Sequence, residues 1–219
     1  MPEVPYRLVL VDDHQILLDS LSTLLGSYEQ FDVVGTAPTA VEGLRMVLDL
    51  EPDVAILDVE LPGRGSFDIA LEVSSRRMNT NVVFLTGYLS DVFIEQALRV
   101  NSNGYLLKDD PSDFLVESIE AVARGESRYS KPVLDRLQYD PLQKKHYIDS
   151  KHQLTSLTTR QLAIMRHLAQ GQSVKEVARH LHLSEKSVDS HKYRIMHTLG
   201  IHDRVELARY AIREGLTLP

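Results

Sequence analysis

The chain has 219 residues, of which 43% are hydrophobic and 25% are charged, a composition typical of a globular protein with one or two domains. The absence of cysteine excludes disulfides and thiolate metal sites. No apolar run approaches the roughly 20 residues that cross a bilayer, and residues 1–7 lack the features of a secretory signal. We therefore expect a cytoplasmic protein with no membrane partner.

The net charge of −7 combines two regions of opposite sign. Residues 151–219 contain 11 Lys+Arg and 6 Asp+Glu, a net charge of +5, and residues 1–150 contain 13 and 25, a net charge of −12. A basic region tolerates a polyanion, whereas an acidic one repels it. Any contact with nucleic acid is therefore expected in the last third of the chain.

Residues 5–125 alternate short apolar runs with amphipathic segments. We predict strands at 7–11, 31–35, 53–57, 81–85 and 104–107, with a helix after each one. Parallel strands require crossover connections, which helices usually provide. Five strand–helix units in series therefore predict a doubly wound α/β domain of the (βα)5 type with a parallel sheet.

Residues 126–153 are polar and are predicted to form a linker with one short helix over 132–138. Residues 154–218 have a purely helical pattern, with helices predicted at 158–169, 174–181, 185–199 and 203–214. Ser173 and Ser184 are expected to cap the second and third of these helices, and Gly171 and Gly200 to end the first and third.

Carboxylates stand at the ends of two predicted strands. Asp12 and Asp13 follow the first strand, and Asp58 follows the apolar run of the third. If the sheet order is 2-1-3-4-5, these strands are neighbours and their ends meet at the switch point of the sheet, where ligands bind. Buried like charges repel one another and are costly to desolvate, which a hard divalent cation relieves. This pattern predicts a Mg²⁺ site.

Two further polar groups follow strands at the same edge. Thr86 ends the fourth strand and offers a hydroxyl, and Lys108 follows the fifth and offers a positive charge. Each residue has a simpler explanation by itself, because Asp12, Asp13 and Thr86 could cap turns or helices and Lys108 could be a solvated charge. Their joint occurrence favours a phosphoryl-acceptor site in which one carboxylate attacks in line.

Residues 5–125 resemble the receiver domain of two-component response regulators. The resemblance rests on Val11-Asp12-Asp13, Leu57-Asp58-Val-Glu-Leu-Pro62-Gly63, Leu85-Thr86-Gly87 and Leu107-Lys108. It implies that Asp58 is the phosphoacceptor and that Mg²⁺ is held by Asp12, Asp13, Asp58 and the main-chain carbonyl of Glu60. It further implies that Thr86 and Lys108 contact the phosphoryl oxygens and that Tyr105 is the switch aromatic. The alternative for Tyr105 is a half-buried aromatic of an edge strand.

Three positions depart from the usual pattern of that family. Gly87 stands where alanine is common, Arg64-Gly65-Ser66 replaces an Asp-Gly turn, and Lys108-Asp109 lacks a frequent proline. The first two bring local geometry and the rate of dephosphorylation into question. His14, which follows the acid pair, is predicted to be exposed in the first turn of a helix.

The helical segment has the pattern of a helix-turn-helix. Val174, Val177 and Leu181 form one apolar face, and the helix at 185–199 has one buried face and one polar, basic face. A small helical bundle that binds another protein would show the same pattern. The segment resembles the four-helix domain of the NarL/FixJ (LuxR-type) regulators, densely from Leu157 to Arg204. That resemblance implies a DNA-reading helix at 185–199, with Asp189, Ser190 and Tyr193 facing bases and Lys186, Ser187, Lys192 and Arg194 contacting phosphates.

We therefore predict a two-component response regulator that acts as a transcription factor and is not an enzyme. A sensor histidine kinase would phosphorylate Asp58 with Mg²⁺, and the protein would then form a homodimer that binds the major groove of a two-fold operator. A first alternative is a phosphotransferase or phosphatase, which would need a substrate-binding insert that the short loops do not offer. A second is a regulator controlled by protein contacts without phosphate.

Overall fold

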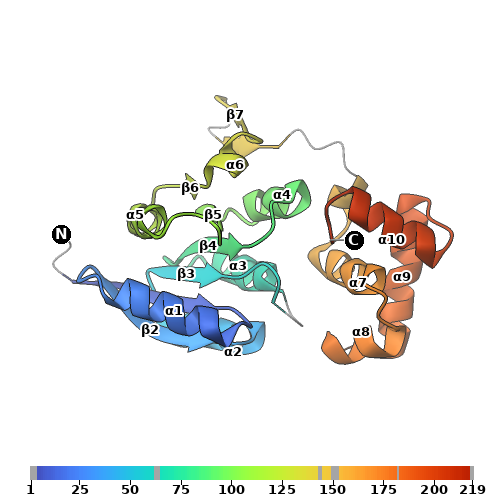
Figure 1. Ribbon diagram of the computed structural model, residues 1–219, viewed down its shortest axis with the longest axis horizontal. Helices are drawn as coiled ribbons and strands as arrows, with labels where there is room; N and C mark the ends of the chain where they lie inside the picture. Colours follow the sequence, from blue (N-terminus) through green and yellow to red (C-terminus); the bar gives the residue numbers. More distant parts are fainter. Residues whose placement is uncertain (1–3, 62–64, 143–144, 149–152, 182, 218–219) are drawn as a thin grey trace.

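The computed structural model describes residues 4–61, 65–142, 145–148, 153–181 and 183–217. An α/β part and a helical part lie side by side (Figure 1). Pro62 and Gly63 of the motif that contains Asp58 lie outside the described residues, as do Arg64, His182 and the last residue, 218, of the predicted helical domain. No helix among the described residues has both the length and the apolar character that a membrane crossing requires.

The α/β part is built on a parallel sheet of six strands in the order β2-β1-β3-β4-β5-β6. The strands are β1 (Tyr6–Val11), β2 (Phe31–Ala37), β3 (Val54–Leu57), β4 (Asn81–Thr86), β5 (Gly104–Leu107) and β6 (Arg128–Tyr129). This confirms the parallel fold, the five predicted strands and their order. The sixth strand was not predicted, because two residues are too few to show the alternation that identifies a strand. It comes from the start of the predicted linker and pairs with β5.

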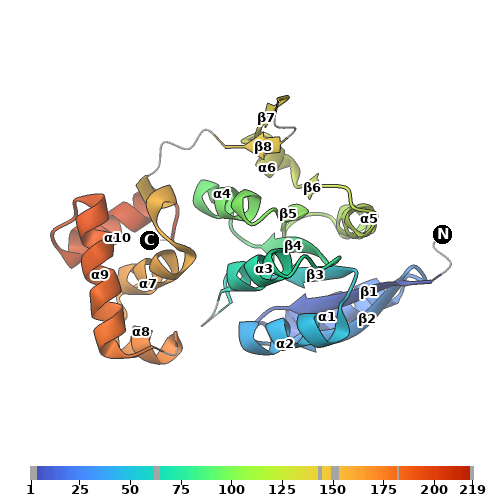
Figure 2. The same cartoon turned by 180° about the vertical axis from the view of Figure 1, so that it is seen from behind.

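Helices cover both faces of the sheet, as Figures 1 and 2 show from opposite sides. Leu8 and Leu10 of β1 belong to one apolar cluster, together with α1 (Gln15–Gly26) and α5 (Ser112–Ala123). Val9 and Val11 belong to the other, with α2 (Ala40–Leu50), α3 (Ser66–Ser75) and α4 (Asp91–Arg99). Successive side chains of a strand point to opposite faces, so a strand buried on both sides is apolar throughout.

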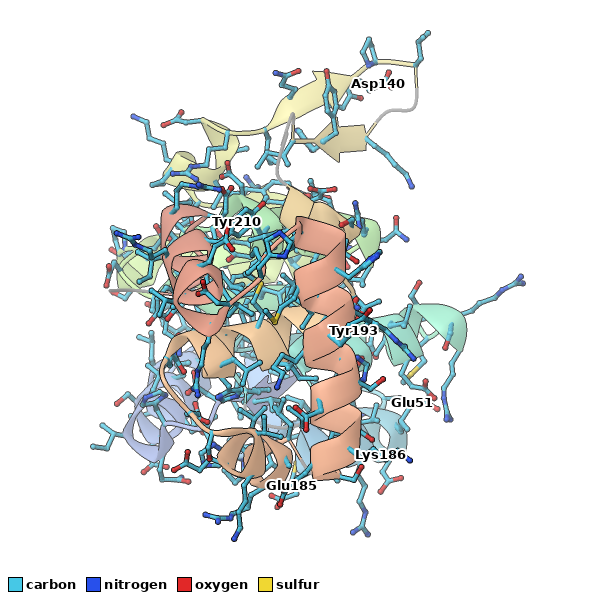
Figure 3. The ribbon with its side chains drawn as sticks, turned by 90° about the vertical axis from the view of Figure 1, so that its right-hand side faces the viewer. Glu51, Asp140, Glu185, Lys186, Tyr193 and Tyr210 are labelled. Carbon is cyan, nitrogen blue, oxygen red and sulfur yellow. The ribbon has the colours of Figure 1, made fainter. Side chains whose placement is uncertain are left out.

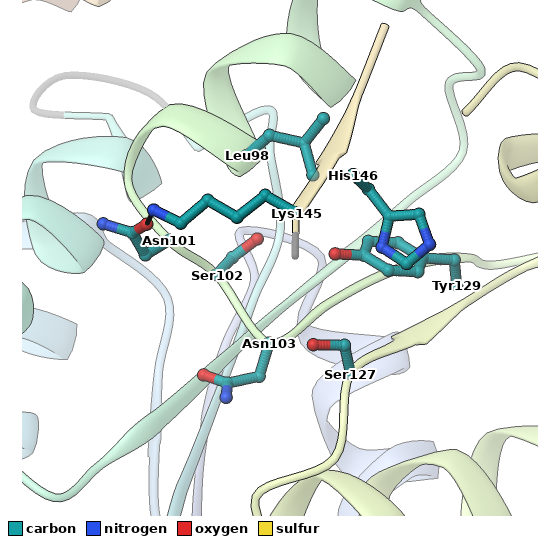
Figure 4. A pocket seen from close by; sticks show the side chains of 8 residues that line it. All are labelled: Leu98, Asn101, Ser102, Asn103, Ser127, Tyr129, Lys145 and His146. Carbon is teal, nitrogen blue, oxygen red and sulfur yellow. Dashed lines mark hydrogen bonds between the residues drawn. The ribbon is translucent and has the colours of Figure 1, made fainter. Parts of the chain in front are cut away.

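The linker is more structured than its sequence indicates. The short helix predicted over 132–138 is present as α6 (Lys131–Leu134), but it ends earlier than predicted. Gln138 instead begins β7 (Gln138–Asp140), which forms an unpredicted antiparallel hairpin with β8 (Lys145–Tyr147). Its Lys145 Nζ donates to Asn101 Oδ1 at 3.2 Å, and the His146 ring packs against Tyr129 at 5.4 Å (Figure 4). The small polar pocket between them lies before β5 begins, at the opposite edge of the sheet from Asp58.

Four α-helices form the C-terminal part, as predicted. They are α7 (Thr159–Ala169), α8 (Val174–His180), α9 (Glu185–Leu199) and α10 (Arg204–Arg213), preceded by a one-turn 3₁₀ helix at Gln153–Ser156. Ser173 and Ser184 cap α8 and α9 as predicted, by accepting from the main-chain N–H groups of Glu176 and Ser187. Gly200 ends α9 with a φ of 65°, a left-handed conformation that glycine adopts without strain.

We predict that Gly43→Ala destabilises the α/β part. Gly43 lies in α2, and a Cβ atom there would be 2.7 Å from both Cγ atoms of the buried Val11. Overpacking of this kind costs about 1–3 kcal/mol, which outweighs the helix propensity of roughly 1 kcal/mol that alanine gains over glycine. Urea unfolding measures the change in the free energy of unfolding.

Gly26→Ala, at the end of α1, is the matched control, because a Cβ atom there would have no neighbour within 4 Å. It should leave the stability unchanged or raise it slightly. If Gly43→Ala is as stable as Gly26→Ala, β1 and α2 are not packed as closely as described.

Candidate functional site

The ends of β1 and β3 bring the acidic residues together. Val11 pairs with Leu57, so the residues that follow them, Asp12 and Asp58, leave the sheet side by side. The Asp58 N–H donates to Val11 O at 2.8 Å, which holds the main chain at this point. Asp12 and Asp58 are buried, with 3% and 2% of their surfaces exposed, whereas Asp13 is exposed. Asp12, Asp13, Asp58 and His14 each offer a ligand atom, and these four atoms lie within 4.8 Å of one another.

Lys108 balances part of this negative charge. Its Nζ lies 2.6 Å from Asp12 Oδ2 and 3.2 Å from Asp58 Oδ1. Burial alone would lower the pKa of Lys108, but the Asp58 and Asp12 carboxylates outweigh burial and raise it. The lysine therefore stays charged and lies between Asp12 and Asp58, as the shared edge of the strands predicted.

Asp58 is a buried acid whose carboxylate has fewer hydrogen-bond partners than it can accept. Burial raises the pKa of Asp58 from 3.8 to about 6, although the nearby Lys108 opposes the rise. Its Oδ2 has no hydrogen-bond donor among the described residues, and its Oδ1 has only the 3.2 Å ion-pair contact with Lys108 Nζ. Unpaired buried carboxylate oxygens are rare and indicate a missing partner. The buried carboxylates of Asp12 and Asp58 beside the exposed Asp13 form a donor set that suits a hard divalent cation such as Mg²⁺.

Thr86 and Tyr105 are linked through hydrogen bonds to the main chain of Tyr88. Thr86 is buried at the end of β4, and its Oγ1 accepts from the Tyr88 N–H at 3.1 Å. The Tyr105 hydroxyl donates to the Tyr88 carbonyl at 2.9 Å. Tyr105 is fully buried, not half-buried, because β6 covers the edge of β5. Burial also raises the pKa of Tyr105, so the hydroxyl remains a donor.

His14 is exposed at the start of α1, as its position after the acid pair suggests. Its side chain is 71% exposed, and its Nδ1 lies 3.0 Å from Asp13 Oδ1 and 3.2 Å from Asp12 Oδ1. The main-chain N–H of His14 donates to Asp12 Oδ1 at 2.8 Å. This hydrogen bond helps to fix the orientation of the Asp12 carboxylate.

Sequence reasoning missed two contacts near the site. The Leu107 N–H, next to Lys108, donates to Ser130 Oγ at 2.8 Å and to Asp110 Oδ2 at 3.0 Å, and Ser130 Oγ also bonds to Asp110. Arg166 of α7 reaches Glu60, with Nη1 2.9 Å from Oε1. Ser130 and Arg166 have no sequence signal, because each joins a residue that is distant in the chain.

The candidate DNA-reading helix, α9, lies along an outer surface of the molecule. Figure 3 shows Lys186 and Tyr193 on its open side, and Tyr193 is 71% exposed. Among the other residues predicted to contact DNA, Asp189, Ser190 and Arg194 are exposed, and Ser187 and Lys192 are half-buried. The opposite face packs through Val188, Ile195 and Leu199.

Two of these seven polar residues are paired with each other. Lys192 Nζ lies 2.6 Å from Asp189 Oδ1, one turn away on the same helix. Ser187 faces the capping Ser184, with 2.9 Å between their hydroxyl oxygens. Lys186 and Arg194 are in no ion pair among the described residues, so they are the cations of α9 most available to a phosphate.

Comparison with known proteins accounts for both parts of the chain. Residues 8–120 match the family model described as "Response regulator receiver domain", and residues 155–211 match "Bacterial regulatory proteins, luxR family". YvfU of Bacillus subtilis, described as an uncharacterized transcriptional regulatory protein, is 30% identical over 209 residues, 95% of this chain and 98% of that protein. The oxygen regulatory protein NreC of Staphylococcus haemolyticus is 29% identical over 213 residues, 96% of this chain and 98% of that protein.

Solved structures resemble the whole chain as well. The response regulator ChrA of a heme-sensing two-component system is 25% identical, with a TM-score of 0.53, and the match covers 98% of this chain and 100% of that one. The RcsB response regulator of Salmonella typhimurium has a TM-score of 0.70 over 96% of this chain and 98% of that one. Its identity of 21% supports the fold alone.

We predict that Asp58→Asn stabilises the metal-free protein at neutral pH. The pKa of Asp58 is about 6 in the folded protein against 3.8 ordinarily, so the folded state binds the proton more tightly than the unfolded chain. The stability linked to that proton is complete below about pH 4 and is lost as the pH rises through about 6. Asparagine carries no charge, so the free energy of unfolding at about pH 7.5 should rise by roughly 1–3 kcal/mol.

Urea unfolding in EDTA at both pH values measures this difference. The gain should shrink as the pH falls and be small near pH 4, where Asp58 is protonated in the folded protein and partly protonated in the unfolded chain. A gain of equal size at both pH values would show that burial of the charge is not its cause.

Proposed function

Because the chain belongs to the bacterial response regulators that combine a receiver domain with a LuxR-type DNA-binding domain, we propose that phosphorylation of Asp58 switches its binding to DNA. Asp58 carries this proposal, because it is a buried carboxylate at the carboxyl edge of the sheet, its Oδ1 faces Lys108 and its Oδ2 has no donor among the described residues. We assign the receiver to residues 5–125, the linker to 126–153 and the DNA-binding domain to 154–218. The phosphodonor would be a sensor histidine kinase in the cytoplasm.

The pocket suits phosphoryl transfer to Asp58. Mg²⁺, held by Asp12, Asp13, Asp58 and the Glu60 carbonyl, would neutralise charge on the phosphoryl oxygens. With a pKa of about 6, Asp58 is mostly ionised at neutral pH and can act as the nucleophile. One of its oxygens bonds to phosphorus while the bond from phosphorus to the donor's nitrogen or oxygen breaks, and the leaving group takes the electron pair. Lys108, already within ion-pair reach of Asp58, would then bind the new phosphoryl group.

Thr86 would carry the change away from the pocket. Its hydroxyl proton is free to turn toward a phosphoryl oxygen, while its Oγ1 accepts from Tyr88 N–H. A shift of Thr86 would therefore move Tyr88, whose carbonyl holds the Tyr105 hydroxyl. Since β5 carries Tyr105 and pairs with β6, this path leads to the linker. We propose these residues as the switch of a two-state receiver.

The output would be sequence-specific binding of DNA by α9. A helix fits the major groove, in which base edges present distinct donors and acceptors. Lys186, Ser187, Lys192 and Arg194 would contact phosphates, and Asp189, Ser190 and Tyr193 would face bases. Two copies related by two-fold symmetry would read a two-fold operator. The relatives described as transcriptional regulatory proteins support this output, and they support regulation in place of enzymatic turnover of a separate substrate.

Phosphoryl incorporation tests the switch. Wild type and Asp58→Ala are incubated with a small-molecule phosphodonor and Mg²⁺, and intact mass is measured. We expect one added phosphoryl group in wild type, none in Asp58→Ala and none in wild type with EDTA. If wild type is not labelled, phosphorylation is contradicted and control by protein contacts is favoured. If Asp58→Ala is labelled, a residue other than Asp58 is the phosphoacceptor.

We also predict that Arg194→Gln weakens DNA binding mainly through its phosphate contact. The slope of log K against log salt concentration should become shallower by about 0.9, with little change in the preference for operator over random DNA. Arg209→Gln on α10, an exposed arginine outside α9, is the control with the same change in charge. Fluorescence anisotropy at several salt concentrations measures both slopes. If the salt-dependence slopes of Arg194→Gln and Arg209→Gln are equal, Arg194 does not contact a phosphate of the DNA.

A further inference from the structure

The DNA-binding domain contacts the receiver at the residue next to the acidic pocket. Arg166 Nη1 lies 2.9 Å from Glu60 Oε1, and its Nη2 donates to the main-chain carbonyl of Glu60 at 3.5 Å. Glu60 is two residues beyond Asp58. One guanidinium group from α7 therefore holds both the side chain and the backbone of the loop that follows β3.

This contact lies in apolar surroundings. A narrow cleft between the two domains is lined by Val59, Leu61, Phe67 and Phe93 of the receiver and by Leu162 and Ala163 beside Arg166 on α7. The side chain of Arg166 is 12% exposed and that of Glu60 is 26% exposed. Ion pairs in such places are screened less than surface pairs, and the loss of one partner leaves the other charge poorly compensated. The Arg166–Glu60 pair is therefore a specific attachment between the domains.

Two cationic groups compete for the main-chain carbonyl oxygen of Glu60. The proposed function gives the Glu60 main-chain oxygen to Mg²⁺, whereas in this structure Arg166 directs an N–H group at it. A guanidinium and a divalent cation repel each other, and neither can approach this oxygen closely without disturbing the other. Docking of the DNA-binding domain and loading of the receiver pocket therefore oppose each other.

We propose that Arg166 is a positioning residue of the receiver pocket, supplied by the DNA-binding domain, and that it competes with Mg²⁺ for the Glu60 carbonyl. The inference rests on the proposed function of the pocket and names its link to the second domain. Loading of the pocket releases α7, and docking of α7 weakens the binding of Mg²⁺ by the same factor, since coupling between two sites is reciprocal. Because α9 is already exposed in the docked form (Figure 3), release changes the orientation of the reading helix and not its accessibility.

Calorimetric titration with Mg²⁺ alone tests the competition in the full chain. Arg166→Gln should bind Mg²⁺ roughly fivefold more tightly than wild type, a factor typical of coupled sites. Arg166→Lys keeps the charge but cannot make both contacts, so its affinity should fall between the two. Arg209→Gln makes the same change in charge away from the cleft and should match wild type.

A distance between the domains provides the second readout. The chain has no cysteine, so Ser75→Cys on α3 and Thr198→Cys on α9, both exposed, give a unique pair of spin labels. Without metal, wild type should show one narrow distance distribution, which broadens when Mg²⁺ and beryllofluoride are added. Arg166→Gln should give the broad distribution without any addition.

The outcomes separate the inference from the function on which it rests. If wild type binds Mg²⁺ and is phosphorylated, but Arg166→Gln matches it in Mg²⁺ affinity or in the distance distribution, the competition is refuted and the switch chemistry stands. If neither protein binds Mg²⁺ and Asp58 is not labelled, the proposed function fails and the inference fails with it. Tighter binding of Mg²⁺ together with separated domains in Arg166→Gln supports the competition.

Discussion

The burial of Asp58 beside Asp12 is the constraint on which the other features of the receiver depend. Parallel pairing of β1 with β3 brings the two carboxylates to one edge of the sheet, where water cannot fully solvate them. Lys108 compensates part of the charge, yet the pKa of Asp58 still rises to about 6 because burial costs the ionised form more than the lysine returns. The ionised carboxylates are therefore costly to keep in the pocket. A positively charged group that binds there offsets this cost, which strengthens its binding.

The sequence was sufficient for the first five strands of the sheet, for the acidic cluster and for the existence of α9. Each depends on a local signal, such as an apolar run that ends on Asp58 or a serine cap three residues before a polar helix face. The order of the strands followed from the general rule for doubly wound sheets. Because the strand ends share one edge, correct prediction of the strands was enough to place Asp12, Asp13, Asp58 and Lys108 near one another.

Features that depend on contacts between distant segments were not predicted. The strand β6 is two residues long and forms by pairing with the edge of β5. Neither Arg128 nor Tyr129 is of a type that indicates this pairing in the sequence. Arg166 and Glu60 are 106 positions apart and each resembles an ordinary surface charge in sequence. The pairing of Lys192 with Asp189 is local, but a choice between a partner on the same helix and a phosphate requires the structure.

The attachment of the linker to the receiver limits how far the DNA-binding domain can travel. The hairpin is bonded to the α/β part through Lys145, and the 3₁₀ helix that enters the helical part begins at Gln153. The five peptide links from Ile148 to Gln153 can extend to no more than roughly 17 Å. So short a connection keeps the domain near its docking face, which makes the effective concentration of one domain around the other high. A weak contact is then sufficient to hold the domains together, and a small change in free energy is sufficient to part them.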